Sequence, residues 1–122
     1  MNKKHRLSRS ADFERAYRQG KSIAGRYAVL YYFNKSGEVG ECGPRLGVSV
    51  SRKVGGAVVR NRVKRILKEV FRARQERLAP DYDYVIIART GLAEYIDKNR
   101  FEDVSGMVED LFRRADLIQE AD

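Results

Sequence analysis

Apolar and polar positions along the chain follow two different periods, and each period predicts one type of element. Apolar side chains recur at spacings of three and four residues in three stretches, which is typical of amphipathic helices. These helices are predicted over residues 8–20, 57–77 and 100–115. In the first of them, Ser8 or Ser10 is available as an N-terminal cap and Gly20 as a C-terminal stop.

Other segments alternate with a period of two, or are apolar on both sides, and predict strands. They cover residues 27–33, 45–50 and 82–88, with a short first strand at 21–24. Tyr27, Val29, Tyr31 and Phe33 share one side of the strand 27–33, and both of its sides are apolar. A turn-rich connection containing Gly37, Gly40 and Gly43 leads from this strand into the next one, so we expect these two strands to pair as a hairpin.

The order of these elements is αβββαβα, which predicts an α+β fold in which helices cover a sheet as a two-layer α/β sandwich. The chain has 122 residues, enough for one hydrophobic core but not comfortably for two. We therefore expect one domain over residues 1–122, with an ordered core at about 6–115.

Charge is distributed unevenly along the chain and points to an anionic partner. Residues 1–77 hold 20 Lys and Arg against 6 Asp and Glu, whereas residues 78–122 hold 5 against 11. Concentrated positive charge of this kind is typical of proteins that bind nucleic acid. A basic protein without such a partner is the plainer alternative.

The predicted helix 57–77 concentrates this charge on one side. Val59, Val63, Ile66, Leu67, Val70 and Phe71 form its apolar stripe, and the opposite side carries a basic group made of Asn61, Lys64, Arg65, Lys68 and Arg72, with Arg60 and Arg62 beside it. Like charges at these spacings repel in the free helix, and an anionic partner would reverse that cost. Gly55 and Gly56 precede the helix and allow phosphate to approach its N-terminal amides. The alternatives for the arginines are a solvated surface or salt bridges to the acidic C-terminal third.

Several classes of protein are disfavoured by the residues present. A single cysteine, Cys42, excludes an internal disulfide, and a single histidine, His5, does not supply the usual zinc ligand sets. No apolar run reaches the length of a membrane span and no export signal is visible, so we expect a cytoplasmic protein. A self-sufficient nuclease would need clustered carboxylates or a His-based acid and base. The acidic pairs Asp81/Asp83 and Glu102/Asp103 are instead expected on the solvated surface.

The segment around the basic helix resembles the protein component of bacterial ribonuclease P. The resemblance rests on the string SRKVGGAVVRNRVKR at residues 51–65, which contains the RNR motif of that family. It extends to Arg6-Leu7, Asp12-Phe13, the segment 27–31 and the string YVIIAR at 84–89, and so covers roughly residues 6–114. It implies a ribosomal-protein-like fold with a left-handed β-α-β crossover, where general statistics favour a right-handed one.

The resemblance further implies a protein that, as a monomer in a 1:1 complex, assists a catalytic RNA. That complex removes the 5′ leader from precursor tRNA by magnesium-dependent hydrolysis, with Mg²⁺ required by the ribonucleoprotein and no cofactor bound by the protein alone. The residues implied in binding the RNA subunit are Arg52, Lys53, Arg60, Asn61, Arg62, Lys64, Arg65 and Lys68. A separate cleft for the single-stranded leader is implied at Phe13, Tyr17, Val29 and Tyr31. No catalytic or metal-binding residue is expected in the protein.

Two alternatives stay open at this point. The aromatic residues of the implied cleft are compatible with an ordinary hydrophobic core, although aromatic side chains also stack well on unpaired bases. Tyr17 stands where many relatives have Phe, which preserves the stacking surface. A ribosomal-type RNA-binding protein is the other functional hypothesis, because the same sandwich topology occurs in ribosomal proteins and fold alone does not determine function.

Overall fold

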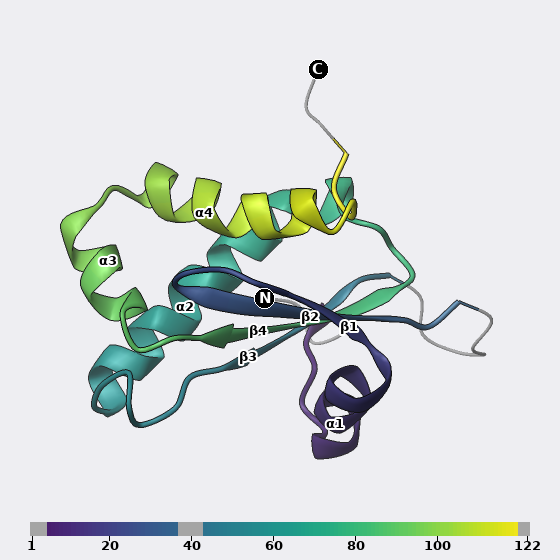
Figure 1. Ribbon diagram of the computed structural model, residues 1–122, viewed down its shortest axis with the longest axis horizontal. Coiled ribbons are helices and arrows are strands. Elements are labelled where there is room, and N and C mark those ends of the chain that lie inside the picture. Colours follow the sequence, from purple (N-terminus) through teal and green to yellow (C-terminus); the bar gives the residue numbers. More distant parts are fainter. Residues whose placement is uncertain (1–4, 37–42, 120–122) are drawn as a thin grey trace.

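The computed structural model describes residues 5–36 and 43–119 and has a mixed α+β architecture (Figure 1). Cys42, Gly37 and Gly40, which enter the sequence-based expectations, lie outside the described residues. The elements in chain order are α1 (Ser10–Gln19), β1 (Lys21–Ala24), β2 (Ala28–Asn34), β3 (Arg45–Ser49), α2 (Ala57–Arg74), the 3₁₀ turn η2 (Gln75–Arg77), β4 (Tyr82–Ala88), α3 (Leu92–Lys98) and α4 (Phe101–Arg114). The predicted α+β class is confirmed.

The four strands form one sheet in the order β1-β2-β4-β3. Strand β2 is antiparallel to both of its neighbours, with Ser22 opposite Tyr31 and Tyr31 opposite Val85. The predicted hairpin between the strands at 27–33 and 45–50 is therefore wrong, because β4 lies between them. Strand β4 has a neighbour on each side and cover on both faces, and its four consecutive residues from Asp83 to Ile86 are accordingly buried.

Strands β3 and β4 are parallel neighbours, in register from Arg45 opposite Asp83 to Ser49 opposite Ile87. A parallel pair needs a crossover connection, and helix α2 with η2 supplies it. This is the β-α-β unit that the family resemblance implies, and its left-handed sense stays a prediction.

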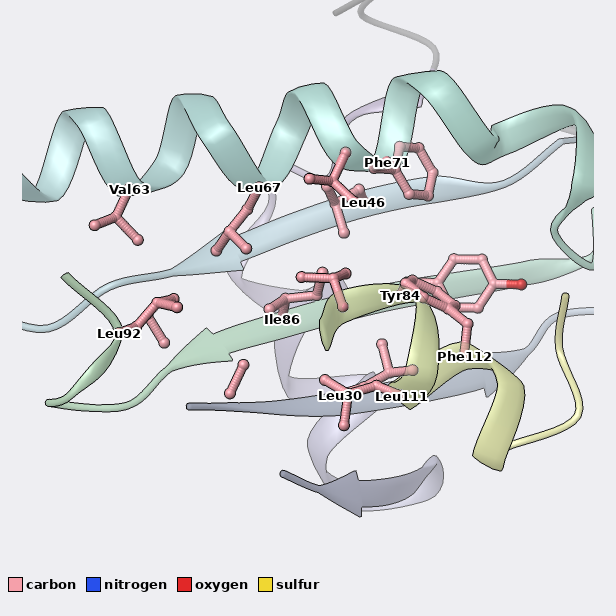
Figure 2. Packing of buried hydrophobic residues seen from close by; sticks show 14 of the residues in the cluster. Leu30, Leu46, Val63, Leu67, Phe71, Tyr84, Ile86, Leu92, Leu111 and Phe112 are labelled. Atoms are coloured by element: carbon pink, nitrogen blue, oxygen red, sulfur yellow. The ribbon is translucent and has the colours of Figure 1, made fainter. Parts of the chain in front are cut away.

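The main core lies between one face of the sheet and helices α2, α3 and α4 (Figure 2). Leu30 and Ile86 project from the sheet, and Tyr84 fills the centre with its ring against Phe71 and Phe112 at centroid distances of 6.2 and 5.1 Å. The Tyr84 hydroxyl donates to the Ala79 carbonyl at 2.8 Å, so its polar end is satisfied although the side chain is buried. Burial raises the pKa of this phenol far above its usual range, which keeps it neutral.

In the described part of the chain, the opposite face of the sheet is covered by α1 and by the segment before it, which contributes Leu7 (Figure 1). Leu7, Ala16 and Val85 are buried there, with Phe13 and Tyr31 half-buried around them. One short helix cannot cover a four-stranded sheet, so part of this face stays open to solvent.

Helix α1 ends close to the sheet because Gly20 has no side chain. A Cβ atom at Gly20 would lie 2.5 Å from the carbonyl oxygens of both Ala16 and Tyr32. Gly20 ends the helix as predicted. Its φ of −85° is not left-handed, so glycine is required here because the neighbouring backbone leaves no room for a side chain. The predicted serine cap is wrong, because the helix is preceded by Arg9 without a capping side chain.

Two features near the C-terminus differ from the predictions. Helix α3 was not predicted, since its seven residues are too few to display a clear helical period. Phe101 belongs to the apolar pattern of the last helix, yet half of its surface is exposed because it stands in the first turn, beyond the edge of the core. None of the helices in the described part of the chain has the length and apolar composition needed to cross a bilayer.

Candidate nucleic-acid interface

Helix α2 presents a basic surface because its apolar stripe is held against the sheet. Val63, Leu67, Val70 and Phe71 are fully buried, as the sequence pattern predicts, while Val59 and Ile66 at the margins of the stripe are only half-buried. The remaining side chains must therefore face outward or lie along the edge of the helix.

The predicted RNA-contacting side chains all lie on or beside this outer side of α2. We call Arg52, Lys53, Arg60, Asn61, Arg62, Lys64, Arg65 and Lys68 the basic surface. Asn61 and Arg65 are exposed on the helix, and Arg52 and Lys53 are exposed in the connection that leads into it. The other four members are half-buried, as is common for long side chains whose aliphatic stems lie along the protein.

Most of this positive charge is not neutralised within the protein. Glu69 is the one acidic residue of α2, and it pairs with Arg72 at 2.8 Å. Among the described residues, no ion pair involves Arg60, Lys64, Arg65 or Lys68. The Nε atom of Arg60 is also buried without a hydrogen-bond partner in the described part of the chain. An anion beside the guanidinium would supply the interaction that this arginine lacks.

Arg62 differs from the other members because its Nη2 lies 2.5 Å from Oδ1 of Asp97 on α3. The alternative of a salt bridge to the acidic C-terminal third therefore applies to Arg62. Both side chains are partly exposed, 38% for Arg62 and 54% for Asp97, so the pair contributes little to stability. It does place α3 directly beside the basic surface.

The N-terminus of α2 adds unsatisfied donors to this surface. Gly56 precedes the helix, and no side chain caps the first amides. A Cβ atom at Gly56 would meet nothing within 4 Å, so the approach to these amides is open. Open amides at the positive end of an 18-residue helix favour phosphate.

A group of aromatic and aliphatic side chains lies on the other face of the sheet, beside α1, where the family resemblance implies the leader cleft. The Tyr17 ring lies edge-on to the Tyr31 ring at 5.0 Å, and the Phe13 and Tyr17 rings are 6.4 Å apart. Val29 lies two residues before Tyr31 on the same side of β2 and is half-buried. The structure therefore brings the four predicted leader-binding residues together, and we call this group with its neighbours the aromatic cleft.

Two further residues belong to the aromatic cleft and were not predicted from the sequence. Ile87 is opposite Val29 in the sheet, and Ser49 is opposite Ile87, so all three share one face. Ser49 lies near enough to Tyr17 to influence the pKa of its hydroxyl. Burial raises the pKa of Tyr17, an effect that Ser49 opposes and Tyr31 reinforces, so the hydroxyl remains neutral at physiological pH. Alternation within the strands 45–50 and 82–88 indicates which side of its own strand each of these two residues occupies. The sequence does not show which strands pair, so it could not place them beside Val29.

Tyr27 does not join this cleft, although simple alternation groups it with Val29 and Tyr31. It precedes the first residue of β2, packs against the main core and stacks on Tyr95 of α3 at 4.3 Å. Alternation predicts a shared face only within a strand.

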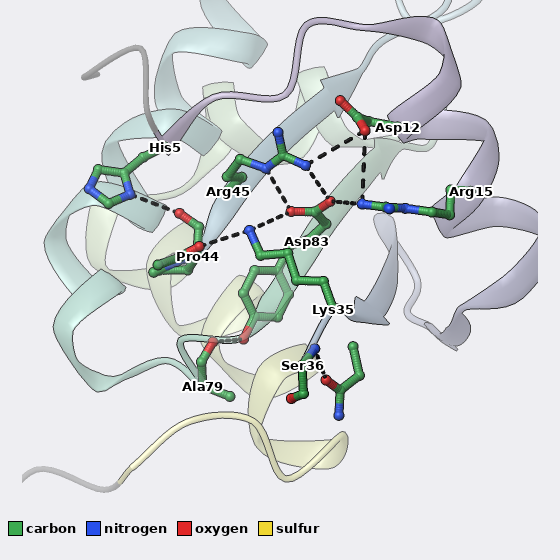
Figure 3. A network of polar contacts seen from close by, with 12 residues as sticks. His5, Asp12, Arg15, Lys35, Ser36, Pro44, Arg45, Ala79 and Asp83 are labelled. Carbon is green, nitrogen blue, oxygen red and sulfur yellow. Dashed lines mark hydrogen bonds and ion pairs between the residues drawn. The ribbon is translucent and has the colours of Figure 1, made fainter. Parts of the chain in front are cut away.

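A buried carboxylate fixes α1 against the sheet at one end of the cleft (Figure 3). Asp83 is fully buried, so its predicted place on the solvated surface is wrong, whereas Asp81 is exposed as predicted. Arg45 donates to both oxygens of Asp83 at 2.9 and 2.7 Å, Lys35 lies 3.0 Å away and Arg15 of α1 donates at 3.1 Å. Three cations from three separate segments therefore compensate one carboxylate, which makes its burial tolerable.

The remaining side chains of types common in catalysis either make structural contacts or lie far from one another in the described part of the chain. His5 Nδ1 lies 2.8 Å from the Pro44 carbonyl oxygen, and its ring is partly buried. Within residues 5–36 and 43–119, no three His, Cys, Asp or Glu side chains gather as potential metal ligands. Two surfaces, one basic and one aromatic, therefore stand out among the described residues.

The family model for ribonuclease P matches residues 1–116 of the chain. The chain belongs to the ribonuclease P protein family. It is 40% identical to the ribonuclease P protein component of Clostridium acetobutylicum over 95% of this chain and 92% of that one. It is 39% identical to the ribonuclease P protein component of Halalkalibacterium halodurans over 98% of this chain and 94% of that one.

Solved structures of the ribonuclease P family share the fold. The Staphylococcus aureus RNase P protein superposes with a TM-score of 0.81 at 30% identity, covering 94% of this chain and 98% of that one. The Thermotoga maritima RNase P protein gives a TM-score of 0.78 at 31% identity, covering 89% and 96%. Membership implies a part in an endoribonuclease that processes tRNA 5′ ends, and it argues against the ribosomal-type alternative.

Replacing Gly47 by Ala is expected to destabilise this ribonuclease P protein by about 1–3 kcal/mol, as overpacking typically does. A Cβ atom there would lie 2.5 Å from the ring of Phe13 and 3.2 Å from Leu7, so Phe13 would be pushed into the aromatic cleft. Urea unfolding measures the change. Gly106→Ala on α4, where an added Cβ meets nothing within 4 Å, is the control and should not destabilise the protein.

Proposed function

We propose that this chain is the protein subunit of a ribonuclease P holoenzyme and binds two RNAs through two surfaces. The basic surface on α2 binds the catalytic RNA subunit, and the aromatic cleft beside α1 binds the single-stranded 5′ leader of precursor tRNA. The observation that carries this proposal is the separation of the two surfaces by the sheet, with α2 packed on one face and α1 on the other. One protein can thus hold both RNAs at the same time.

The basic surface acts through charge. Lys and Arg side chains without an ion-pair partner among the described residues, such as Arg65, replace the counterions of the RNA phosphates. The open amides of α2 donate hydrogen bonds to a further phosphate. Asn61 offers an amide donor and acceptor for a phosphate or a 2′-hydroxyl. This binding depends on backbone and shape more than on base identity.

The aromatic cleft acts through stacking. Tyr17 and Tyr31 expose ring surface beside Val29, and every unpaired base offers a face that stacks on such rings. Mature tRNA has no leader to fill the cleft. The protein therefore favours precursor over product, and it orients the leader so that the scissile phosphodiester is held in place.

The hydrolysis itself is assigned to the RNA subunit with Mg²⁺, in the cytoplasm. The protein contributes binding and orientation, and its own residues move no proton in the reaction. The protein is a monomer, and one copy of it binds one RNA subunit.

Reconstitution of precursor-tRNA cleavage tests this function. A ribonuclease P RNA transcript from a related species is assayed at low Mg²⁺ concentration with and without the protein, and the protein is assayed alone. We expect strong stimulation of the RNA and no cleavage by RNA-free protein. Absence of stimulation would refute the proposed role, and cleavage by the protein alone would revive the nuclease hypothesis.

Replacing Tyr17 by Ala is expected to weaken holoenzyme binding to precursor tRNA by roughly 5- to 100-fold, because one stacked base contributes about 1–3 kcal/mol. Tyr17 is 38% exposed, so the change should spare the fold. Binding of precursor and mature tRNA is compared by equilibrium titration. Tyr32→Ala, on the other side of β2, is the matched control and should leave the preference intact. Equal losses on both tRNAs would contradict a leader-specific cleft.

A further inference from the structure

A second aromatic site lies apart from the aromatic cleft, between the turn that joins β1 to β2 and helix α3. It is a pocket of about 410 Å³, within the range of pockets that hold small ligands. We call it the α3 pocket. Its lining residues are Arg26, Tyr27, Gly91, Glu94, Tyr95, Lys98 and Asn99.

The wall of the α3 pocket is an aromatic platform. The rings of Tyr27 and Tyr95 are stacked, with centroids 4.3 Å apart and an angle of 26° between their planes. The guanidinium of Arg26 lies 5.4 Å from the centre of the Tyr27 ring. Both tyrosines are anchored on the main core and are only partly buried, so they offer rigid ring surface to a ligand.

The polar groups around this platform suit a nucleotide. Asn99 Nδ2 donates to the Tyr95 carbonyl at 2.9 Å, which leaves its Oδ1 as an acceptor for a base edge. Two basic residues of the lining, Arg26 and Lys98, outnumber its single acid, Glu94, which is paired with Lys98 at 2.6 Å. A stacking surface with an excess of positive charge is the combination that single-stranded nucleic acid requires.

The position of the α3 pocket connects it to the basic surface. The parallel strands β3 and β4 both end at this end of the sheet, and β2 begins there. Strand β3 continues to Arg52 and Lys53, while the end of β4 is tied to the pocket by a 2.9 Å hydrogen bond from the Arg89 amide to the Tyr27 carbonyl. The Arg62–Asp97 ion pair joins the basic surface to the far side of α3.

We propose that the α3 pocket binds an unpaired base of the same RNA subunit that the basic surface binds. This proposal rests on the proposed function. Tyr27 and Tyr95 pack on the core that α2 covers, whereas the leader cleft lies on the opposite face of the sheet. An RNA strand held by α2 that passes over α3 reaches the pocket, and the leader does not.

Replacing Tyr95 by Leu and by Phe tests this assignment. Leu removes one of the two rings of the platform, while Phe keeps the ring and loses only a hydroxyl whose contact with the Asp103 carbonyl is 3.5 Å long. We expect the full-length Leu variant to bind a ribonuclease P RNA transcript roughly 5- to 100-fold more weakly and the Phe variant to bind like the unaltered protein. The salt dependence of binding should not change, because no phosphate contact is lost.

Gly91→Leu supplies an independent variant if Tyr95→Leu melts below the assay temperature. The backbone φ of Gly91 is −83°, and a Cβ atom would lie at an ordinary contact distance of 3.6 Å from the Tyr27 ring. Because Gly91 lines the pocket, a larger side chain there is expected to occupy its volume. It should lower RNA affinity to a similar extent without a large fall in the melting midpoint.

The outcomes separate this proposal from the proposed function. If the unaltered protein fails to bind the RNA transcript, the proposed function fails. If it binds and both pocket variants bind equally well, the α3 pocket is not an RNA site. If the variants instead lose only the preference for precursor over mature tRNA, the occupant is the leader and the assignment to the RNA subunit is overturned.

Discussion

Replacing Asp83 by Asn is expected to destabilise the protein by about 3–5 kcal/mol, a large part of the stability of a domain this size. The substitution keeps the shape of the side chain but removes the charge that compensates Arg45, Lys35 and Arg15. Lys35 suffers most, because only 5% of its side chain is exposed and water cannot replace the lost partner. Urea unfolding followed by circular dichroism measures the loss.

The neighbouring Asp81 provides a matched control for Asp83. It is exposed and lies only two residues away, so Asp81→Asn should change the free energy of unfolding by less than about 0.5 kcal/mol. Similar values for the two variants would show that the buried network contributes little. Asp83→Asn should also weaken leader binding, since Arg15 ties α1, and with it Phe13 and Tyr17, to the sheet through this carboxylate.

Stability is also expected to depend on Asp83 in acid. Burial alone raises the pKa of this carboxyl, but the hydrogen bonds and charges of Arg45 and Lys35 outweigh it and hold the pKa below its ordinary value of 3.8. A depressed pKa in the folded state gives stability that is complete above the unfolded value and is lost as the pH falls through the folded one. Unfolding free energies measured below about pH 4 should therefore fall in the unaltered protein and fall less in Asp83→Asn.

Replacing Arg60 and Arg65 together by Ala is expected to weaken binding of the RNA subunit by roughly 10- to 50-fold at 0.15 M salt, if each contacts one phosphate. These two are better probes than Arg62, whose ion pair with Asp97 must be broken before its loss can be interpreted. The log-log salt dependence should flatten by about 1.4–1.8 for the two contacts. Titrations at several salt concentrations give both quantities.

Arg72→Ala is the control for this double variant. Arg72 lies on the same helix and is exposed, but its charge is already paired with Glu69. Its removal should leave both the affinity and the slope nearly unchanged. A double variant with unaltered affinity and slope would contradict the assignment of the basic surface to RNA.

The basic surface is proposed to bind the RNA subunit and the aromatic cleft the leader, and these variants can distinguish the two contributions. Loss of charge on α2 should reduce RNA-subunit binding and its salt dependence, whereas loss of Tyr17 should reduce precursor preference alone. The α3 pocket adds a third signature, lower RNA affinity with unchanged salt dependence. Each class of variant thus has its own expected pattern.

Local features of this protein were determined by the sequence itself. The helical periods at residues 57–77 and 100–115 are visible because each apolar stripe repeats over several turns, and α2 and α4 follow them closely. The strands at 21–24 and 82–88 have the predicted bounds. The RNR motif at 60–62 and its surroundings sufficed to indicate the family, because such a string is a local property of the chain.

Only the tertiary structure decided which distant segments meet. Strand order depends on pairing between residues far apart in the chain, so the sequence could not place β4 between β2 and β3. The same limit hid Ser49 and Ile87 in the cleft and the α3 pocket beside Tyr27. Asp83 is the clearest case, because a charged carboxylate is costly to bury without compensating partners, and its three cations come from segments 38 to 68 residues away.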